Sequence, residues 1–337
     1  MQWQQYLRRV FCDRHAPVIL MCHRVAEPRW DPWALSIAPA RFDEQLRHLA
    51  AERIPLPMCE LVARLEDGTL PARAVAVTFD DGYVDNLRVA KPILEKHGVP
   101  ATVFLATGYV GRHSEFWWDE LTRLILGRRE PLTGAIVLGA RTIPVRLETV
   151  DGDDGGVSSG WRADERPRTL RQQLYCDVWR ELRVLEPAAR EEALERIREL
   201  FGSPAASPDD LPMTAEEVRR LVRGSHGTID IGAHSESHRP LTAVPVGDRA
   251  REIRQSGRAC EALAGKAIDG FAYPHGDVDR MTRDLVRNSG FRWACSTRHA
   301  AVDRAHFDLF DLPRVQMRNW TASELDRTLA RAASKAA

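Results

Sequence analysis

Two adjacent carboxylates, Asp80 and Asp81, end an apolar run that begins at Val75 and are followed by Gly82. Side chains along a strand alternate between its two faces, so neighbouring aspartates can serve one site only where the strand stops and the backbone turns. Glycine allows such a turn because it adopts backbone conformations that other residues avoid. The pattern therefore predicts two carboxylates presented together at the end of a strand.

Two histidines, His234 and His238, follow a second apolar run at 229–233. A spacing of four positions lets both imidazoles face one point on a helical turn. One carboxylate and two imidazoles make a metal site with open coordination positions. Either motif alone is more often a solvated turn or a surface feature. Both follow predicted strands, however, and parallel sheets and barrels gather their active groups at the carboxyl edge, so together they predict a metal hydrolase.

The elements that must position these residues alternate between strand and helix. Apolar runs predict seven strands, at 17–22, 75–79, 101–106, 229–233, 270–273, 292–296 and 311–315. Amphipathic stretches follow most of them. One apolar helical face is expected to carry Phe42, Leu46, Leu49 and Ala50. Another helix is expected to begin with a capping box formed by Thr214 and Glu217. Repeated strand–helix units predict an α/β fold with a parallel sheet.

Residues 113–212 interrupt this alternation. They contain a β-like segment near 135–147 and helical stretches between 166 and 201, which predict an inserted α+β segment. The rest of the chain, 1–112 and 213–337, would form the main domain. An acidic, glycine-rich stretch at 151–156 lacks the alternating acidic positions of a calcium-binding loop, so we expect a solvated turn there.

Three ordered motifs resemble the signatures of the polysaccharide deacetylase family. They are Thr78-Phe79-Asp80-Asp81-Gly82, His234-Ser235-Glu236-Ser237-His238 and Phe271-Ala272-Tyr273-Pro274-His275-Gly276. Similar segments at 18–25, 101–105 and 213–217 extend the resemblance. This family is carbohydrate esterase family four, built on the chitooligosaccharide deacetylase homology domain. The resemblance implies a distorted, incomplete (β/α)7 barrel, with 113–212 as an insertion within it.

The resemblance also implies a metal-dependent N-deacetylase that acts on an N-acetylated amino sugar in a glycan or glycan precursor. Asp81, His234 and His238 would bind a divalent ion, with zinc the first choice for a nitrogen-rich set. Asp80 would be the general base that takes the proton of the attacking water. The backbone amide of His275, which stands where most relatives carry tyrosine, would help to hold the tetrahedral oxyanion.

Two further assignments follow from departures from the family's usual pattern. Most relatives carry the general acid in a Leu-x-His segment near the carboxyl end, and Ile19-Leu20-Met21-Cys22-His23 resembles that segment moved by circular permutation. His23 is therefore the candidate acid, although a histidine that ends an apolar strand is more often a core or edge residue. Ala272 stands where many relatives have an arginine that orients the base. Arg314 could substitute for it, or could be a surface cation beside Asp311.

Two alternative functions stay open at this stage. A de-N-formylase or another small-amide hydrolase acting on a sugar would differ by one methyl group in its pocket, a difference of about 1 to 3 kcal/mol. No residue reports the volume of that pocket. A non-catalytic carbohydrate-binding member of the family would keep the barrel, but it would have no need for a base beside the metal. Ala272 and His275 alone support that alternative.

Composition restricts the partners and the location. Basic and acidic residues number 48 each, so the overall charge does not suggest a nucleic-acid partner, and the N-acetylated carbohydrate is the partner we expect. Scattered cysteines indicate neither a disulfide framework nor a cysteine zinc site.

Charged residues interrupt the first 15 positions, and no apolar run is long enough to span a membrane. These features predict a cytoplasmic protein, which could still associate with the inner face of the membrane. The oligomeric state is left open.

Overall fold

The computed structural model describes residues 15–139, 141–149, 160–223 and 228–334. The acidic stretch 151–156, where we expect a turn, lies outside the described residues. So do residues 1–14, whose interrupting charges contributed to the expectation of a cytoplasmic protein. Within the described part of the chain, no helix is both long and apolar enough to cross a bilayer.

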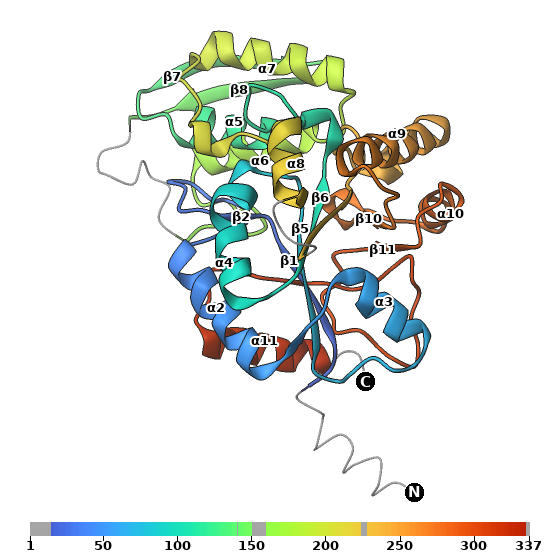
Figure 1. Cartoon of the computed structure of the whole chain (residues 1–337). Helices are drawn as coiled ribbons and strands as arrows, with labels where there is room; N and C mark the ends of the chain where they lie inside the picture. Colours follow the sequence, from blue (N-terminus) through green and yellow to red (C-terminus); the bar gives the residue numbers. More distant parts are fainter. Residues whose placement is uncertain (1–14, 140, 150–159, 224–227, 335–337) are drawn as a thin grey trace, which may run out of the picture. The chain divides into compact units, whose positions relative to one another are not determined.

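Seven parallel strands form the central sheet in the order β11-β10-β9-β6-β5-β1-β12. Their bounds are β1 Val18–Cys22, β5 Ala74–Phe79, β6 Ala101–Leu105, β9 Ile229–Ala233, β10 Gly270–Ala272, β11 Trp293–Cys295 and β12 Val315–Gln316. Figure 1 labels β1, β5, β6, β10 and β11 of this sheet. A short strand, β4 Ile54–Pro55, pairs beside β5. Six of the predicted strands are present close to their expected bounds, whereas the one expected at 311–315 is only Val315–Gln316. The predicted distorted, incomplete (β/α)7 barrel is confirmed.

The two end strands of this sheet are joined only loosely. β12 pairs with β1, with Val315 opposite Leu20. Three residues earlier, Leu312 makes an isolated parallel bridge to Cys295 of β11. The segment before β12 therefore connects the two end strands, β11 and β12, through an isolated bridge instead of a continuous ladder. This is why the barrel is distorted and incomplete.

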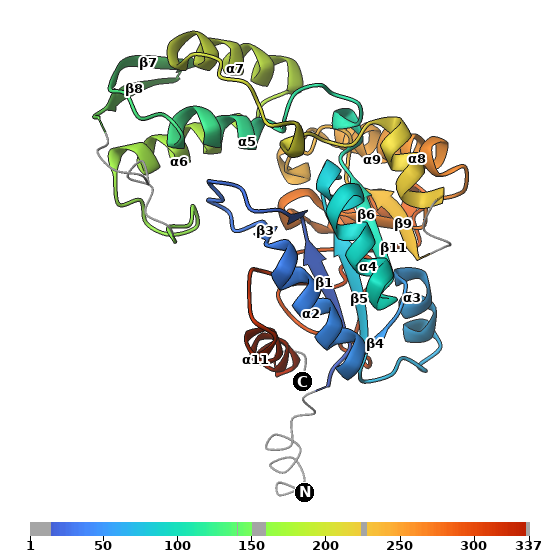
Figure 2. The ribbon, with the colours of Figure 1, turned by 60° about the vertical axis from the view of Figure 1, so that its left-hand side comes forward.

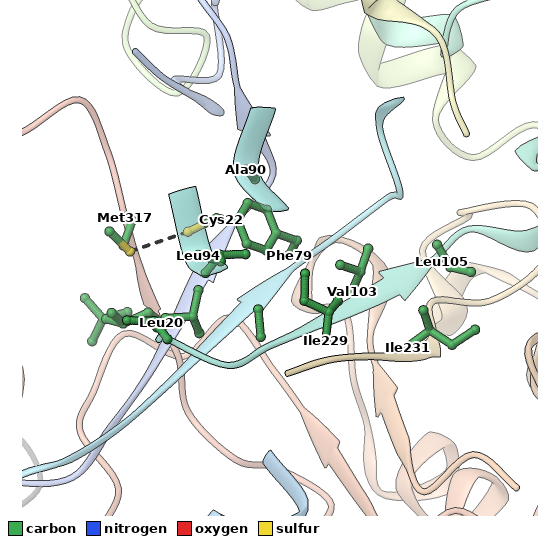
Figure 3. Packing of buried hydrophobic residues seen from close by; sticks show 14 of the residues in the cluster. Leu20, Cys22, Phe79, Ala90, Leu94, Val103, Leu105, Ile229, Ile231 and Met317 are labelled. Atoms are coloured by element: carbon green, nitrogen blue, oxygen red, sulfur yellow. Dashed lines mark hydrogen bonds between the residues drawn. The ribbon is translucent and has the colours of Figure 1, made fainter. Parts of the chain in front are cut away.

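Alternate residues of the strands enter two different layers, as the period of two requires. One set packs beneath the helices and includes Leu20, Phe79, Val103 and Ile231, which belong to the cluster of buried apolar residues labelled in Figure 3. The other set faces the barrel interior and contains Ile19, Ala76, Phe104, Ala272, Cys295 and Leu312. Apolar residues of the helix α3, Met58–Glu66, join this interior cluster, so the barrel is packed rather than open.

Helices and short turns follow the strands. In the main domain they are α2 Pro39–Glu52, α3 Met58–Glu66, η1 Asn86–Ala90, α4 Lys91–His97, η2 Thr107–Tyr109, α8 Ala215–Arg223, η5 Leu241–Ala243, α9 Val246–Ala264, η6 Pro274–Gly276, α10 Arg280–Asn288 and α11 Ala322–Ala333. Figure 2 shows α2, α4 and α11 gathered along one side of the strands. A two-stranded parallel pair, β2 Arg24–Val25 and β3 Ser36–Ile37, lies beyond the end of β1.

Two helix predictions have different outcomes. The capping box is confirmed, because Thr214 N donates to the Glu217 carboxylate (2.9 Å) and Glu217 N donates to Thr214 Oγ1 (3.2 Å). The apolar face of α2 is wrong at Ala50, which is exposed. Gln45 is buried instead, since its amide donates to the backbone oxygens of Arg318 and Trp320. Gln45 is therefore buried by its hydrogen bonds to a distant segment, which the spacing of apolar residues in the sequence cannot predict.

The chain divides into two compact units. The barrel unit comprises 1–27, 36–111 and 213–337, and the insertion unit comprises 28–35 and 112–212. The insertion unit contains α5 Trp117–Leu121, η3 Thr122–Leu126, the antiparallel pair β7 Leu132–Leu138 and β8 Arg141–Leu147, α6 Leu170–Leu182, α7 Pro187–Phe201 and η4 Pro208–Asp210. The short segment 28–35 joins it because Trp33 packs on Trp179, with ring centroids 4.4 Å apart, and donates a hydrogen bond to the Tyr175 hydroxyl.

Candidate metal centre

The site lies at the carboxyl end of the strands, on the interior face. In β5 this face runs through Ala76 and Thr78 and reaches Asp80, the first residue after the strand. The same period of two leads from Ile19 of β1 to His23, and from Leu312 to Arg314. Because alternate residues of a strand share one face, side chains from distant parts of the sequence converge at the carboxyl end of the strands.

The turn after β5 keeps both aspartates at that place. Asp80 N donates to Cys22 O at 3.0 Å and so extends the pairing of β5 with β1. Asp81 then leaves the strand conformation with φ of 72°, and Gly82 follows with φ of 91° while its N–H donates to Asp80 O. Both carboxylates are buried. Glycine suits position 82 because other residues are strained at this positive φ, and a Cβ there would also lie 2.7 Å from Leu105 Cδ2.

Two imidazoles meet the Asp81 carboxylate. Its Oδ1 lies 3.2 Å from His238 Nε2 and 3.7 Å from His234 Nε2. Ligand atoms of all three residues lie within 4.8 Å of one another. His234 Nδ1 is 2.8 Å from Ala272 O, so it donates to this carbonyl and leaves the Nε2 lone pair directed towards the carboxylate.

The helical turn expected at 234–238 is wrong. Ser235 and His238 have φ of 60° and 55°, and this segment forms a tight loop instead. Its N–H groups bond to side chains: those of Glu236 and Ser237 donate to the Glu252 carboxylate of α9, at 2.9 and 2.8 Å. His238 N donates to Ser235 Oγ. The two histidines therefore converge through a side-chain-stabilised loop rather than through helical periodicity.

Arg314 forms a bidentate ion pair with Asp80. Its Nη1 and Nη2 each lie 2.7 Å from a carboxylate oxygen, while its Nε donates to Ser296 O at 3.0 Å. The side chain is completely buried, so the alternative of a surface cation beside Asp311 does not fit. Phe104 lies beneath the guanidinium, 5.6 Å from ring centroid to Cζ.

Charge and burial set the ionisation of this cluster. Burial opposes the ionisation of Asp80, but the Arg314 guanidinium outweighs it and holds the pKa of that carboxyl well below its usual range. Burial likewise opposes the ionisation of Asp81, whose pKa is nevertheless lowered by His238. Burial lowers the pKa of His234 to about 4, so its imidazole is neutral near pH 7 and can act as a ligand.

His23 and His275 lie at the border of the cluster. His23 is close enough that a positive charge on its ring would lower the pKa of both aspartates, by less than Arg314 does for Asp80 and His238 does for Asp81. The ring of His275 packs edge-on against His238, with centroids 4.6 Å apart. Its backbone has φ of 58°, in the left-handed region.

The donor set fits a divalent cation. One buried carboxylate and two imidazoles converge, one imidazole is held in a defined tautomer, and no lysine or arginine pairs with Asp81 among the described residues. The buried group of Asp81, His234 and His238 could therefore bind a metal ion.

Two contributors to the site had not been predicted. Ala272 was expected only as a missing arginine, yet its carbonyl orients His234. Glu252 lies on the buried stripe of α9, three positions after Arg249 and four before Ser256. A carboxylate on an otherwise buried helical stripe was the signal that could have identified it, because such a charge needs a partner.

Comparison with known proteins identifies sequences related to this chain. The profile of the polysaccharide deacetylase family matches residues 67–126 and 202–294. A poly-beta-1,6-N-acetyl-D-glucosamine N-deacetylase of Staphylococcus aureus is 32% identical over 80 residues, which cover 23% of this chain. The aligned region spans only 28% of that relative's length.

Solved structures share the fold over most of the chain. The Streptococcus pyogenes deacetylase PplD in complex with acetate has a TM-score of 0.56 at 16% identity, covering 93% of this chain and 97% of that one. IcaB from Ammonifex degensii has a TM-score of 0.57 at 18% identity, covering 95% and 97% respectively. At these identities the likeness establishes the barrel fold.

Proposed function

Because the chain belongs to the polysaccharide deacetylase family, we propose that it is a metal-dependent N-deacetylase. It would hydrolyse the acetamide of an N-acetylated amino sugar in a glycan or glycan precursor. The observation that carries this proposal is the arrangement of the two adjacent aspartates. Asp81 faces two imidazoles, whereas Asp80 is clamped by Arg314 beside them. A module that only binds sugar has no need for the second carboxylate.

Asp81, His234 and His238 would hold the metal, with zinc expected from two nitrogen ligands and one oxygen ligand. When bound, a divalent ion supplies a Lewis acid that polarises the amide carbonyl and lowers the pKa of water enough for a weak carboxylate base to deprotonate it. The bond from His234 to Ala272 O fixes the ring orientation that this binding needs.

Asp80 acts as the general base. It stays ionised because Arg314 lowers its pKa, and the bidentate pair fixes its orientation. Asp80 takes one proton from water as the water oxygen bonds to the carbonyl carbon. The amide of His275 donates to the oxyanion that forms, and Arg314 acts as a positioning residue.

His23 acts as the general acid. The C–N bond breaks with its electron pair on nitrogen, and a proton from His23 converts the departing group into an amine instead of an amide anion. The products are acetate and the free amino sugar. The cytoplasmic location stays a prediction.

The direct test is product release from a panel of N-acetylated and N-formylated amino sugars, free, polymeric and lipid-linked. We expect acetate release with added zinc or cobalt and its loss after chelation. Formate release at higher kcat/KM would instead identify a de-N-formylase. Metal binding with no hydrolysis of any substrate would favour a carbohydrate-binding protein.

Two variants separate the roles of the site residues. Asp80→Asn should retain the metal but lose about 100-fold or more in kcat, because a general base is removed. His234→Ala should lose both metal and turnover, because a ligand is removed. Metal content measured on the purified variants checks this difference. Equal metal loss in both would contradict the separate roles of Asp80 and the ligands.

A further inference from the structure

A buried ion pair lies beside the site and has no part in the chemistry proposed above. Arg24 Nε is 3.0 Å from Asp85 Oδ2, and both side chains are buried. The Arg24 guanidinium also lies over the ring of Tyr83, 4.5 Å from its centroid. Arg24 directly follows His23, and Asp85 lies just beyond the turn at Asp81. The pair therefore ties together the two chain segments that carry the proposed acid and base.

Hydrogen bonds extend this pair to the backbone around His23. Asp85 Oδ1 accepts from Val25 N and from Asn86 Nδ2, each at 3.0 Å. The same Asn86 Nδ2 donates to His23 O at 2.9 Å. Side chains of the segment that follows the aspartates thus hold the peptide groups on both sides of Arg24.

His23 needs such support because the sheet does not provide it. The ladder between β1 and β5 ends with Cys22 opposite Phe79, and His23 is the first residue beyond it. The buried Nδ1 of the His23 ring has no hydrogen-bond partner among the described residues. The hydrogen bond from Asn86 Nδ2 to the His23 backbone oxygen therefore helps to place the residue that carries this imidazole.

An ion pair is a poor choice if stability alone is needed here. Burying two charges costs desolvation energy, and apolar residues of similar volume often stabilise a protein as well or better. Charged and amide side chains do, however, fix direction as well as distance, which packed apolar groups do less sharply. Arg24, Asp85 and Asn86, which we call the brace, therefore connect the two segments in a fixed orientation.

We propose that Arg24, Asp85 and Asn86 are positioning residues that fix the His23 imidazole relative to Asp80 and Asp81. This inference rests on the proposed function, in which His23 is the general acid. The inference has a selective consequence. Removing these interactions should slow the step that needs a general acid and leave unchanged the rates of the steps that need only the metal and the base.

Two substrates with different leaving groups measure that selectivity. An N-acetylated amino sugar requires a proton on its departing nitrogen, whereas 4-nitrophenyl acetate releases a stable phenolate without one. We expect Asp85→Asn to lower kcat on the amide by about 10- to 100-fold. Metal-dependent ester hydrolysis and metal Kd should stay within about threefold of the unaltered protein. His23→Ala should show the same selective loss.

A second variant and a control keep this test decisive. Asn86→Ala removes the bond to His23 O while leaving the Arg24–Asp85 pair, so it is expected to fold and to show a smaller selective loss. Leu329→Ala, a buried change in α11 remote in sequence from the brace, should lower Tm and leave the ratio of the two rates unchanged.

Three results are distinguishable. Equal loss on both substrates in Asp85→Asn and Asn86→Ala, or no loss on either, would overturn the brace while His23→Ala still reports the acid. If the ratio of the amide rate to the ester rate in His23→Ala equals that of the unaltered protein, His23 is not the acid, and the positioning role of Arg24, Asp85 and Asn86 is overturned with it. A selective loss in all three variants would support both.

Discussion

Asp80 and Asp81 are neighbours in the chain, but their surroundings give them different tasks. Asp80 shares both oxygens with Arg314, whereas Asp81 faces two imidazoles. Two carboxylates whose environments differ in this way can divide the roles of base and ligand between them. The left-handed conformation of Asp81 makes that division possible, because a regular strand would send the second carboxylate to the other face.

At the scale of single residues, His234 predicts a pH dependence of stability. Its pKa falls from 6.5 to about 4 on folding, so between these values the unfolded chain binds the proton that the folded chain rejects. Stability is therefore fully present above about pH 6.5 and is lost as the pH falls towards 4. The loss attributable to this residue is on the order of 3 kcal/mol.

Denaturant unfolding of metal-free protein at pH 7 and at pH 4.5 checks this dependence. His234→Gln cannot take up the proton, so its stability should fall less between the two pH values, by about 2 to 3 kcal/mol. His306→Gln, a change at an exposed histidine, is the matched control and should behave like the unaltered chain. An identical fall in all three proteins would show that His234 is not the titrating group.

At the scale of elements, the loop between β9 and α9 predicts a loss of metal affinity from a residue that touches no metal. Glu252 accepts hydrogen bonds from Glu236 N, Ser237 N and Ser237 Oγ, and so holds the loop that places His238. Glu252→Gln keeps the shape but replaces one acceptor with a donor. We expect metal affinity to fall by about 10- to 100-fold, as for other groups that orient ligands.

Titration of metal-free protein with zinc in competition with a chelating dye measures this affinity. Glu261→Gln changes an exposed glutamate of the same helix and should leave Kd unaltered. Unchanged affinity in Glu252→Gln would mean that the loop holds its shape without the carboxylate.

Most of the strands could be read from the sequence, because each is a short apolar run that ends at a polar or turn-forming residue. The parity that aims Asp80 at the interior was also visible, since it follows from the strand period. The loop at His234 and His238 was not, because its conformation depends on Glu252 in another element. The burial of Gln45 in α2 was missed for the same reason. Contacts between distant segments leave no local pattern.

At the scale of the whole molecule, the site depends on chain segments that are far apart. Asp81 lies more than 150 positions before the two histidines, and Arg314 lies still further along. All of them belong to the barrel unit, although the insertion at 112–212 separates them in the sequence. The tie between 28–35 and the insertion unit could not be predicted, because it rests on contacts of Trp33 with α6. A metal bound at this site would crosslink β5 and β9 through the residues that follow them.

Metal-linked stability tests that convergence. A ligand that binds only the folded chain raises the free energy of unfolding by RT ln(1 + [L]/Kd), about 2.7 kcal/mol when free metal is 100 times Kd. Zinc added to chelator-treated protein should therefore raise Tm by about 4 °C for a chain of 337 residues. His234→Ala should lose most of this rise, because it removes one of three ligands. Hydrogen exchange should slow in β5 and β9 and stay unchanged in β7 and β8, since the latter belong to the insertion unit. Protection confined to β7 and β8, or an equal Tm rise in His234→Ala, would place the cation elsewhere.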